Sequence, residues 1–167
     1  MKRNLFLIPA CSIIALLLGC QSGPVKVAAV ANPDDYKSGP RPGTAVVAGE
    51  AFGRTKGGDV KTAAGLSVYL DPVTPYSTEV FKTLAKHGAF EAEKESDTIV
   101  FDATMLKSRR RTAGDSSGRF RFERVAAGDY FVSCYVRWMK SNGWYSGGWK
   151  VKRIRVREGQ VIENLVL

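Results

Sequence analysis

The sequence predicts an all-β fold, an antiparallel β-sandwich of about seven strands with one short helical insertion between core strands. Two observations carry this prediction. Residues 118–140 alternate apolar and polar side chains with the period of two that a half-buried strand requires. Turn signals, among them Gly128 next to Asp129, separate this stretch and several shorter alternating segments. A body spanning residues 44–167 can bury roughly two-thirds of its unfolded surface, so such a core needs no disulfide.

Residues 118–140 are expected to form two strands joined by a tight turn, at the centre of the core. Phe120 and Phe122 share one side of the first strand. One side of the second strand carries Tyr130, Val132, Cys134, Val136 and Trp138. Further strands are expected at residues 44–54, 66–70, 98–101, 150–157 and 160–167.

The one helical signal lies in the predicted insertion, residues 72–111. Thr74 followed by Pro75 supplies a capping residue and then proline at the first helical position, and Ser77-Thr78-Glu79 offers a second possible start. An apolar stripe follows at Val80, Phe81 and Leu84. The basic run 107–111 near the end of the insertion is expected in a solvated loop.

Residues 1–19 have the pattern of a secretory signal, with a basic start and an apolar run at residues 5–18. A spanning helix needs ~20 apolar residues, so this run is short for one. It ends in Leu17-Leu18-Gly19-Cys20, which resembles the lipobox of bacterial lipoproteins. The resemblance implies cleavage before Cys20 and acylation of its sulfur and amino nitrogen. The alternative is an ordinary signal peptide with a chance cysteine at its end.

Residues 20–43 are expected to be the lipidated N-terminus and a flexible tether, because prolines and glycines recur there without sustained periodicity. Two or more acyl chains make membrane anchoring stable. Gln21, rather than aspartate, follows Cys20. The lipoprotein resemblance therefore implies a bacterial outer-membrane protein that faces the periplasm, with exposure at the cell surface left open.

The charge balance is basic. The formal net charge is +9, and removing Lys2 and Arg3 with the signal lowers it to +7. An exported protein is not expected to meet nucleic acid, so anionic glycans, glycolipids and phospholipid head groups are the polyanions that remain. The alternative is that the charge only aids solubility.

The order of the strands resembles the carboxypeptidase regulatory-like domain, a transthyretin-like sandwich. The match covers most of residues 45–167 without the insertion. It rests on Val47-x-Gly49-x-Ala51, Gly65-x-x-Val68-x-Leu70, Asp115-x-x-Gly118-x-Phe120-x-Phe122, Val125-x-x-Gly128-x-Tyr130 and Ile154-x-Val156-x-x-Gly159. These are structural motifs, so the resemblance implies a fold and no chemistry.

The sequence offers few groups for catalysis. His87 is the only histidine, and Cys134 is the only cysteine left once residues 1–19 are removed and Cys20 is acylated. A catalytic zinc site needs three protein ligands, and no such set is visible. Glu91, Glu93 and Glu95 lie in a polar, lysine-containing run typical of a solvated face. We expect no enzyme, no metal and no cofactor, and a buried Cys134 thiol.

The candidate ligand or partner surface is Trp144, Tyr145 and Trp149 beside Arg153 and Arg155. These three rings, with glycines nearby, are the candidate for an aromatic platform, which would stack on a sugar or seat in a membrane interface. The alternative is that at least two of the three rings pack over the open end of the sandwich. We therefore expect a binding or adaptor module for an envelope protein or a glycan, with a structural subunit of an envelope or secretion assembly as the alternative.

Overall fold

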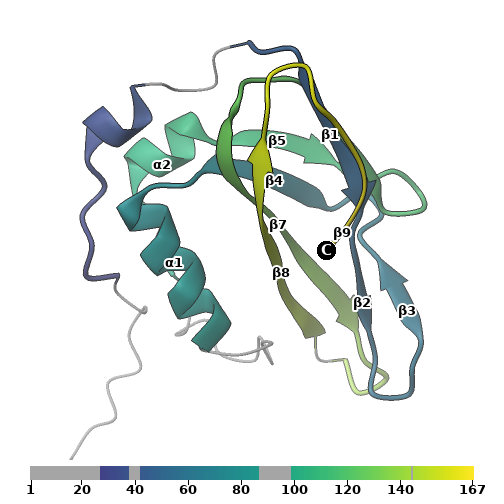
Figure 1. Cartoon of the computed structure of the whole chain (residues 1–167). Coiled ribbons are helices and arrows are strands. Elements are labelled where there is room, and N and C mark those ends of the chain that lie inside the picture. Colours follow the sequence, from purple (N-terminus) through teal and green to yellow (C-terminus); the bar gives the residue numbers. More distant parts are fainter. Residues whose placement is uncertain (1–26, 38–41, 87–98, 144) are drawn as a thin grey trace, which may run out of the picture.

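The computed structural model describes residues 27–37, 42–86, 99–143 and 145–167, which form two packed β-sheets with helices against one outer face (Figure 1). The strands are β1 (Ala45–Glu50), β2 (Phe52–Arg54), β3 (Val60–Thr62), β4 (Ser67–Pro72), β5 (Arg110–Ala113), β6 (Arg119–Val125), β7 (Gly128–Met139), β8 (Tyr145–Val156) and β9 (Val161–Val166). The helical elements are the short 3-10 helix η1 (Pro33–Tyr36), α1 (Pro75–Lys86) and α2 (Ala103–Ser108). The predicted all-β sandwich is confirmed.

One sheet has the strand order β6-β1-β9, the other β5-β4-β7-β8, and β2 and β3 form a separate two-stranded ribbon. The described residues hold more strands than the seven or so predicted. The segment predicted as one strand at residues 44–54 divides at Ala51 into β1 and β2. One pair also departs from the antiparallel pattern, because β9 lies parallel to β1.

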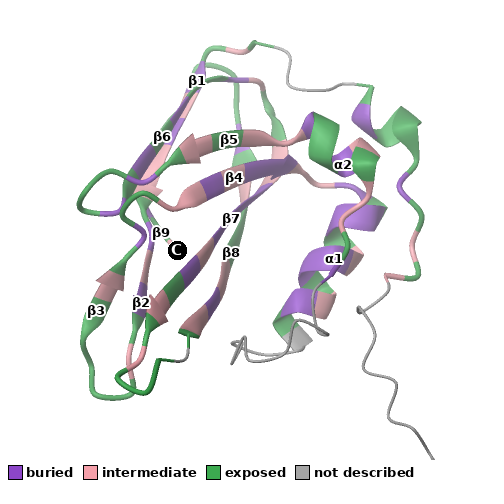
Figure 2. Ribbon diagram, turned by 180° about the vertical axis from the view of Figure 1, so that it is seen from behind, coloured by how far each residue is buried: buried purple, intermediate pink, exposed green. Residues whose placement is uncertain are grey.

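The core lies between the two sheets. Val47 and Phe122 face it from one sheet, and Val68, Val132 and Cys134 from the other, each no more than 3% exposed. The predicted centre of the core is therefore confirmed. Figure 2 shows the buried residues along the central strands and the exposed ones at the turns.

The expected pairing within residues 118–140 is wrong, because β6 and β7 belong to different sheets. Arg124 has a φ of 54°, in the left-handed region, close to the point where the chain leaves one sheet for the other. The Tyr130 hydroxyl donates to the carbonyl oxygen of Ala126 at 3.1 Å and holds this crossover. The hairpin that does form joins β7 to β8, which pair over twelve residues each.

A second apolar cluster covers part of the outer face of the four-stranded sheet. Val80, Phe81 and Leu84 of α1 are at most 4% exposed, which confirms the predicted stripe. The Phe81 ring lies 4.7 Å from that of Phe131 on β7, measured between centroids. The cluster therefore fixes α1 on the sheet (Figure 1).

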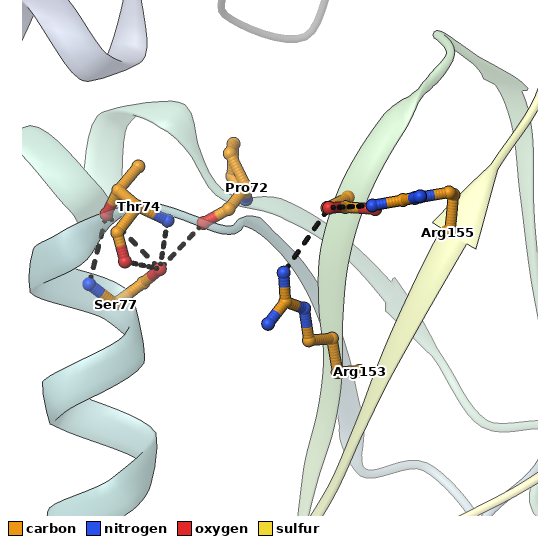
Figure 3. Close-up of polar contacts among 6 residues, drawn as sticks. Pro72, Thr74, Ser77, Arg153 and Arg155 are labelled. Carbon is orange, nitrogen blue, oxygen red and sulfur yellow. Dashed lines mark hydrogen bonds and ion pairs between the residues drawn. The ribbon is translucent and has the colours of Figure 1, made fainter.

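Helix α1 begins at Pro75, the first of the two predicted starts. Ser77 N–H donates to Thr74 Oγ1 at 3.0 Å, and Thr74 N–H donates back to Ser77 Oγ at 2.8 Å (Figure 3). This reciprocal pair satisfies backbone donors that a helix start otherwise leaves open. Pro75 occupies the first helical position, where its missing N–H costs nothing.

Helix α2 was not predicted, and the described part of the strand expected at residues 98–101 is irregular. Asp102 Oδ1 accepts the N–H of Thr104 at 2.7 Å and caps α2. Met105 of α2 is fully buried in the second cluster. A helix of six residues is too short to show the period that would have identified it.

The predicted flexible tether, residues 20–43, is wrong for its middle part. The backbone N–H groups of Ala28 and Ala29 donate to the two carboxylate oxygens of Glu79 on α1, each at 3.0 Å. Ala31 and Tyr36 are buried against the helices, where they complete the second cluster. No helix in the described ranges is long and apolar enough to cross a membrane.

Candidate functional site

The predicted surface residues that the structure describes all lie on β8. Tyr145, Trp149, Arg153 and Arg155 occupy alternate positions and therefore share the outer face of the four-stranded sheet. Ten residues separate Tyr145 from Arg155, which is about 33 Å along a strand. The set is spread along the strand and does not converge on one point. Cys20 and Trp144 lie outside the described residues.

Arg153 and Arg155 share one carboxylate, that of Asp129 on β7. Arg155 donates from Nε and Nη2 at 2.7 and 3.1 Å, and Arg153 donates from Nη2 at 3.3 Å (Figure 3). The hydrogen bonds from Arg155 lower the pKa of the Asp129 carboxyl, which favours the charged form. This end of the face therefore already contains an anionic partner for its arginines.

Trp149 belongs to a group of rings that sequence reasoning did not assemble. Its ring centroid lies 5.5 Å from Tyr135, 5.9 Å from Phe101 and 6.4 Å from Tyr69. All four side chains are partly buried, and Trp149 and Phe101 pack against the second cluster. We call Tyr69, Phe101, Tyr135 and Trp149 the aromatic face.

The guanidinium of Arg109 supports two of these rings. Its Cζ lies 4.4 Å from the Tyr69 centroid and 4.8 Å from that of Phe101. Arg109 Nε and Nη2 also donate to the two oxygens of Asp71, at 2.7 and 3.0 Å. The side chains of Arg109 and Asp71 are only 8% and 0% exposed. Burial raises the pKa of the Asp71 carboxyl, and the bonds and charge of Arg109 oppose that rise.

The basic run 107–111 is therefore not a solvated loop. Arg109 is buried, and Arg110 begins β5 and donates to the carbonyl oxygens of Glu123 and Arg124 in the other sheet, at 2.5 and 3.2 Å. Each of these two guanidinium groups has an acceptor, which is why neither needs to remain in water.

Arg111 and Arg137 give the aromatic face a basic edge. Arg111 lies opposite Tyr69 in the β4–β5 ladder, and the Arg137 guanidinium lies 5.1 Å from the Tyr145 ring centroid. Both arginines are exposed, and within the described part of the chain neither forms an ion pair. Their charges are available to an anionic ligand.

Of the other residues considered as reactive groups, the structure describes only Cys134, and it does not belong to the aromatic face. Cys134 is fully buried, and burial raises the pKa of its thiol to about 11, so the thiol is neutral and unreactive at neutral pH. The predicted buried thiol is confirmed. His87, Glu91, Glu93 and Glu95 lie outside the described residues. Among residues that are described, no three side chains of the metal-binding types form a cluster.

A polar groove of about 810 Å³ lies near the outer side of the three-stranded sheet. Its charged lining includes Glu50, Arg119, Arg121 and Glu163. The one aromatic residue in its lining, Phe120, is only 3% exposed. The groove therefore lacks the exposed ring that would stack on a sugar, and the aromatic face is the stronger candidate site.

No protein-family model and no curated protein matches the chain. Among solved structures, the chain is similar to a proposed carbohydrate-binding protein from Pseudomonas aeruginosa (PA1324). The TM-score is 0.70 at 23% identity, over 83% of this chain and 97% of that one. This likeness supports the β-sandwich fold. The chain is more distantly similar to BcpA, the major pilin subunit of Bacillus cereus, with a TM-score of 0.43, 13% identity and coverage of 75% of this chain and 29% of that one.

Proposed function

We propose that this chain is a non-catalytic, lipid-anchored binding module of the bacterial cell envelope whose ligand is an anionic glycan. The observation that carries the proposal is the aromatic face with its basic edge. Ring faces offer an apolar surface to the C–H groups of a sugar. Guanidinium groups pair with carboxylates or phosphates through two parallel hydrogen bonds, which Arg111 and Arg137 are placed to supply.

Two further observations support the proposal. The net charge after removal of Lys2 and Arg3 is +7, which favours anionic partners. The protein from Pseudomonas aeruginosa that shares the fold is described as a proposed carbohydrate binder, and this module would use the same sandwich for the same class of ligand. The anchor itself rests on the Leu17-Leu18-Gly19-Cys20 motif.

Replacing Trp149 with alanine is expected to weaken glycan binding about tenfold or more, because truncating a central aromatic contact typically costs ~2 kcal/mol. Wild-type protein is first screened on an array of acidic and neutral glycans, and the affinity for the best acidic ligand is then measured by calorimetry. Trp149→Phe should retain most of the affinity, since it keeps a ring.

Val161→Ala on β9 is the matched control, because Val161 is 59% exposed and lies in the other sheet. It should bind as the wild type does. The proposal fails if no acidic glycan binds, or if Trp149→Ala and Val161→Ala bind equally well.

The N-terminal peptide of the protein from bacterial membranes is expected to begin at Cys20 and to carry acyl chains. Mass spectrometry of that peptide measures both properties. Cys20→Ser should lose the acyl chains, because serine has no thiol to modify. The proposed anchor is contradicted if the wild-type peptide begins at another residue or if Cys20 carries no acyl chain. Neither result affects the glycan-binding test.

A further inference from the structure

The β2–β3 turn and the β7–β8 turn lie at the same end of the sandwich (Figure 1). Residues from both line a hollow of about 420 Å³. We call it the open-end pocket. The β2–β3 ribbon supplies Thr55, Lys56, Gly57, Asp59 and Lys61, and the β7–β8 hairpin supplies Trp138, Met139, Lys140 and Ser146. Its volume is within the range of small-molecule sites, ~300–1,000 Å³. Its lining residues differ from those of the aromatic face.

Trp138 gives the pocket a fixed aromatic wall. It occupies the same side of β7 as Cys134 and Val136, and it packs against the core while remaining partly exposed. Gly53 leaves the room that the indole needs, since a Cβ at that position would lie 2.8 Å from Trp138 Cζ3. A sugar ring in the pocket would meet an indole whose orientation is already set by packing.

The charges of the pocket favour an anion. Three lysines and one aspartate line it. Over the described residues, Lys56 and Lys61 make no ion pair, so their ammonium groups are free to bind a ligand. Lysine is a common phosphate-binding residue and acts there as a compact point charge.

Asp59 and Ser146 add polar groups of another kind. A carboxylate accepts hydrogen bonds only, and a hydroxyl both donates and accepts. Asp59 therefore repels a bare anion but suits a ligand whose anionic group is accompanied by hydroxyl donors. The combination of ammonium groups, a carboxylate and an indole matches a sugar phosphate better than inorganic phosphate or a neutral sugar.

We propose that the open-end pocket binds a phosphorylated sugar residue, with the ring against Trp138 and the phosphate between Lys56 and Lys61. The site is separate from the aromatic face, so the proposal stands or falls independently of glycan binding there. The phosphorylated sugar can belong to a soluble molecule or to the head group of a glycolipid, and both present the same chemistry.

The test is calorimetry on the full-length protein in a non-ionic detergent, with glucosamine 1-phosphate, glucosamine and inorganic phosphate as separate ligands. Glucosamine 1-phosphate should bind at least tenfold more tightly than the other two, and its affinity should fall as salt is raised. Competition by a detergent-dispersed glycolipid with a phosphorylated glucosamine head group identifies a lipid-bound source. Its failure to compete identifies a soluble one.

The double variant Lys56→Gln/Lys61→Gln should weaken binding of glucosamine 1-phosphate at least tenfold. Lys82→Gln on α1 is the matched control, because Lys82 is exposed and lies outside the pocket. Trp149→Ala should also bind as the wild type does. The proposal is overturned if the double variant retains wild-type affinity, if inorganic phosphate binds as well as the sugar phosphate, or if Trp149→Ala abolishes binding.

Discussion

Replacing Asp71 with alanine is expected to lower the free energy of unfolding by about 3–5 kcal/mol, the usual cost of removing one partner of a buried ion pair. The variant leaves the Arg109 guanidinium between two rings without its carboxylate, at a side-chain exposure of 8%. The loss reflects an uncompensated buried charge more than the strength of the pair itself. Urea unfolding followed by circular dichroism measures it.

The ion pair of Asp129 provides the control. Asp129→Ala removes the acceptor of Arg153 and Arg155, which are exposed and remain hydrated, so stability should change little. The double variant Asp71→Leu/Arg109→Met should recover most of the stability lost by Asp71→Ala, because it leaves no buried charge. If Asp71→Ala and Asp129→Ala lower the free energy of unfolding equally, the Asp71–Arg109 pair is not a buried ion pair.

Phe122→Ala is expected to cost about 3–5 kcal/mol, because it removes a large ring from a close-packed core. Phe122 is 3% exposed, lies opposite Val47 in the β1–β6 ladder, and has its ring centroid 6.1 Å from that of Phe120. The substitution would leave a cavity between the two sheets. The sheets cannot close around it without disturbing their packing, so the cavity keeps its full cost. The shift of the urea midpoint at constant slope measures the loss.

Val166→Ala, at a residue 43% exposed on β9, should change the midpoint far less. A loss below about 1 kcal/mol for Phe122→Ala would contradict the buried position of this ring, since even smaller core truncations cost that much.

Alternation in the sequence predicted which side chains face the core but could not predict strand partners. Phe120 and Phe122 face inward on β6, and Val132 and Cys134 do so on β7, as expected. Both strands have the same period whether they pair with each other or lie in opposite sheets. The difference depends on the backbone at Arg124 and on the Tyr130–Ala126 hydrogen bond, which alternation does not encode.

The candidate site was predicted only in part, for a related reason. Trp149 and Tyr145 stand out in the sequence, whereas Tyr69, Phe101 and Tyr135 come from three other segments. The register of β4, β7 and β8 brings Tyr69, Tyr135 and Trp149 together on one face, and no local pattern reports that register. The prediction of a solvated loop at residues 107–111 was wrong because two neighbouring arginines find separate partners. Arg109 pairs with the buried Asp71, and Arg110 donates to backbone carbonyl oxygens of β6.

The hydrogen bonds from the backbone of Ala28 and Ala29 to Glu79 have a consequence for how the protein responds to tension from its proposed anchor. Along the described chain, the first contacts after the proposed anchor at Cys20 are the packing of Val27 against the second cluster and the hydrogen bonds of Ala28 and Ala29 to Glu79. A pull from the N-terminal side therefore loads these contacts and α1 before it loads the sheets. We therefore expect the helical layer to detach under such a pull before the sandwich is strained.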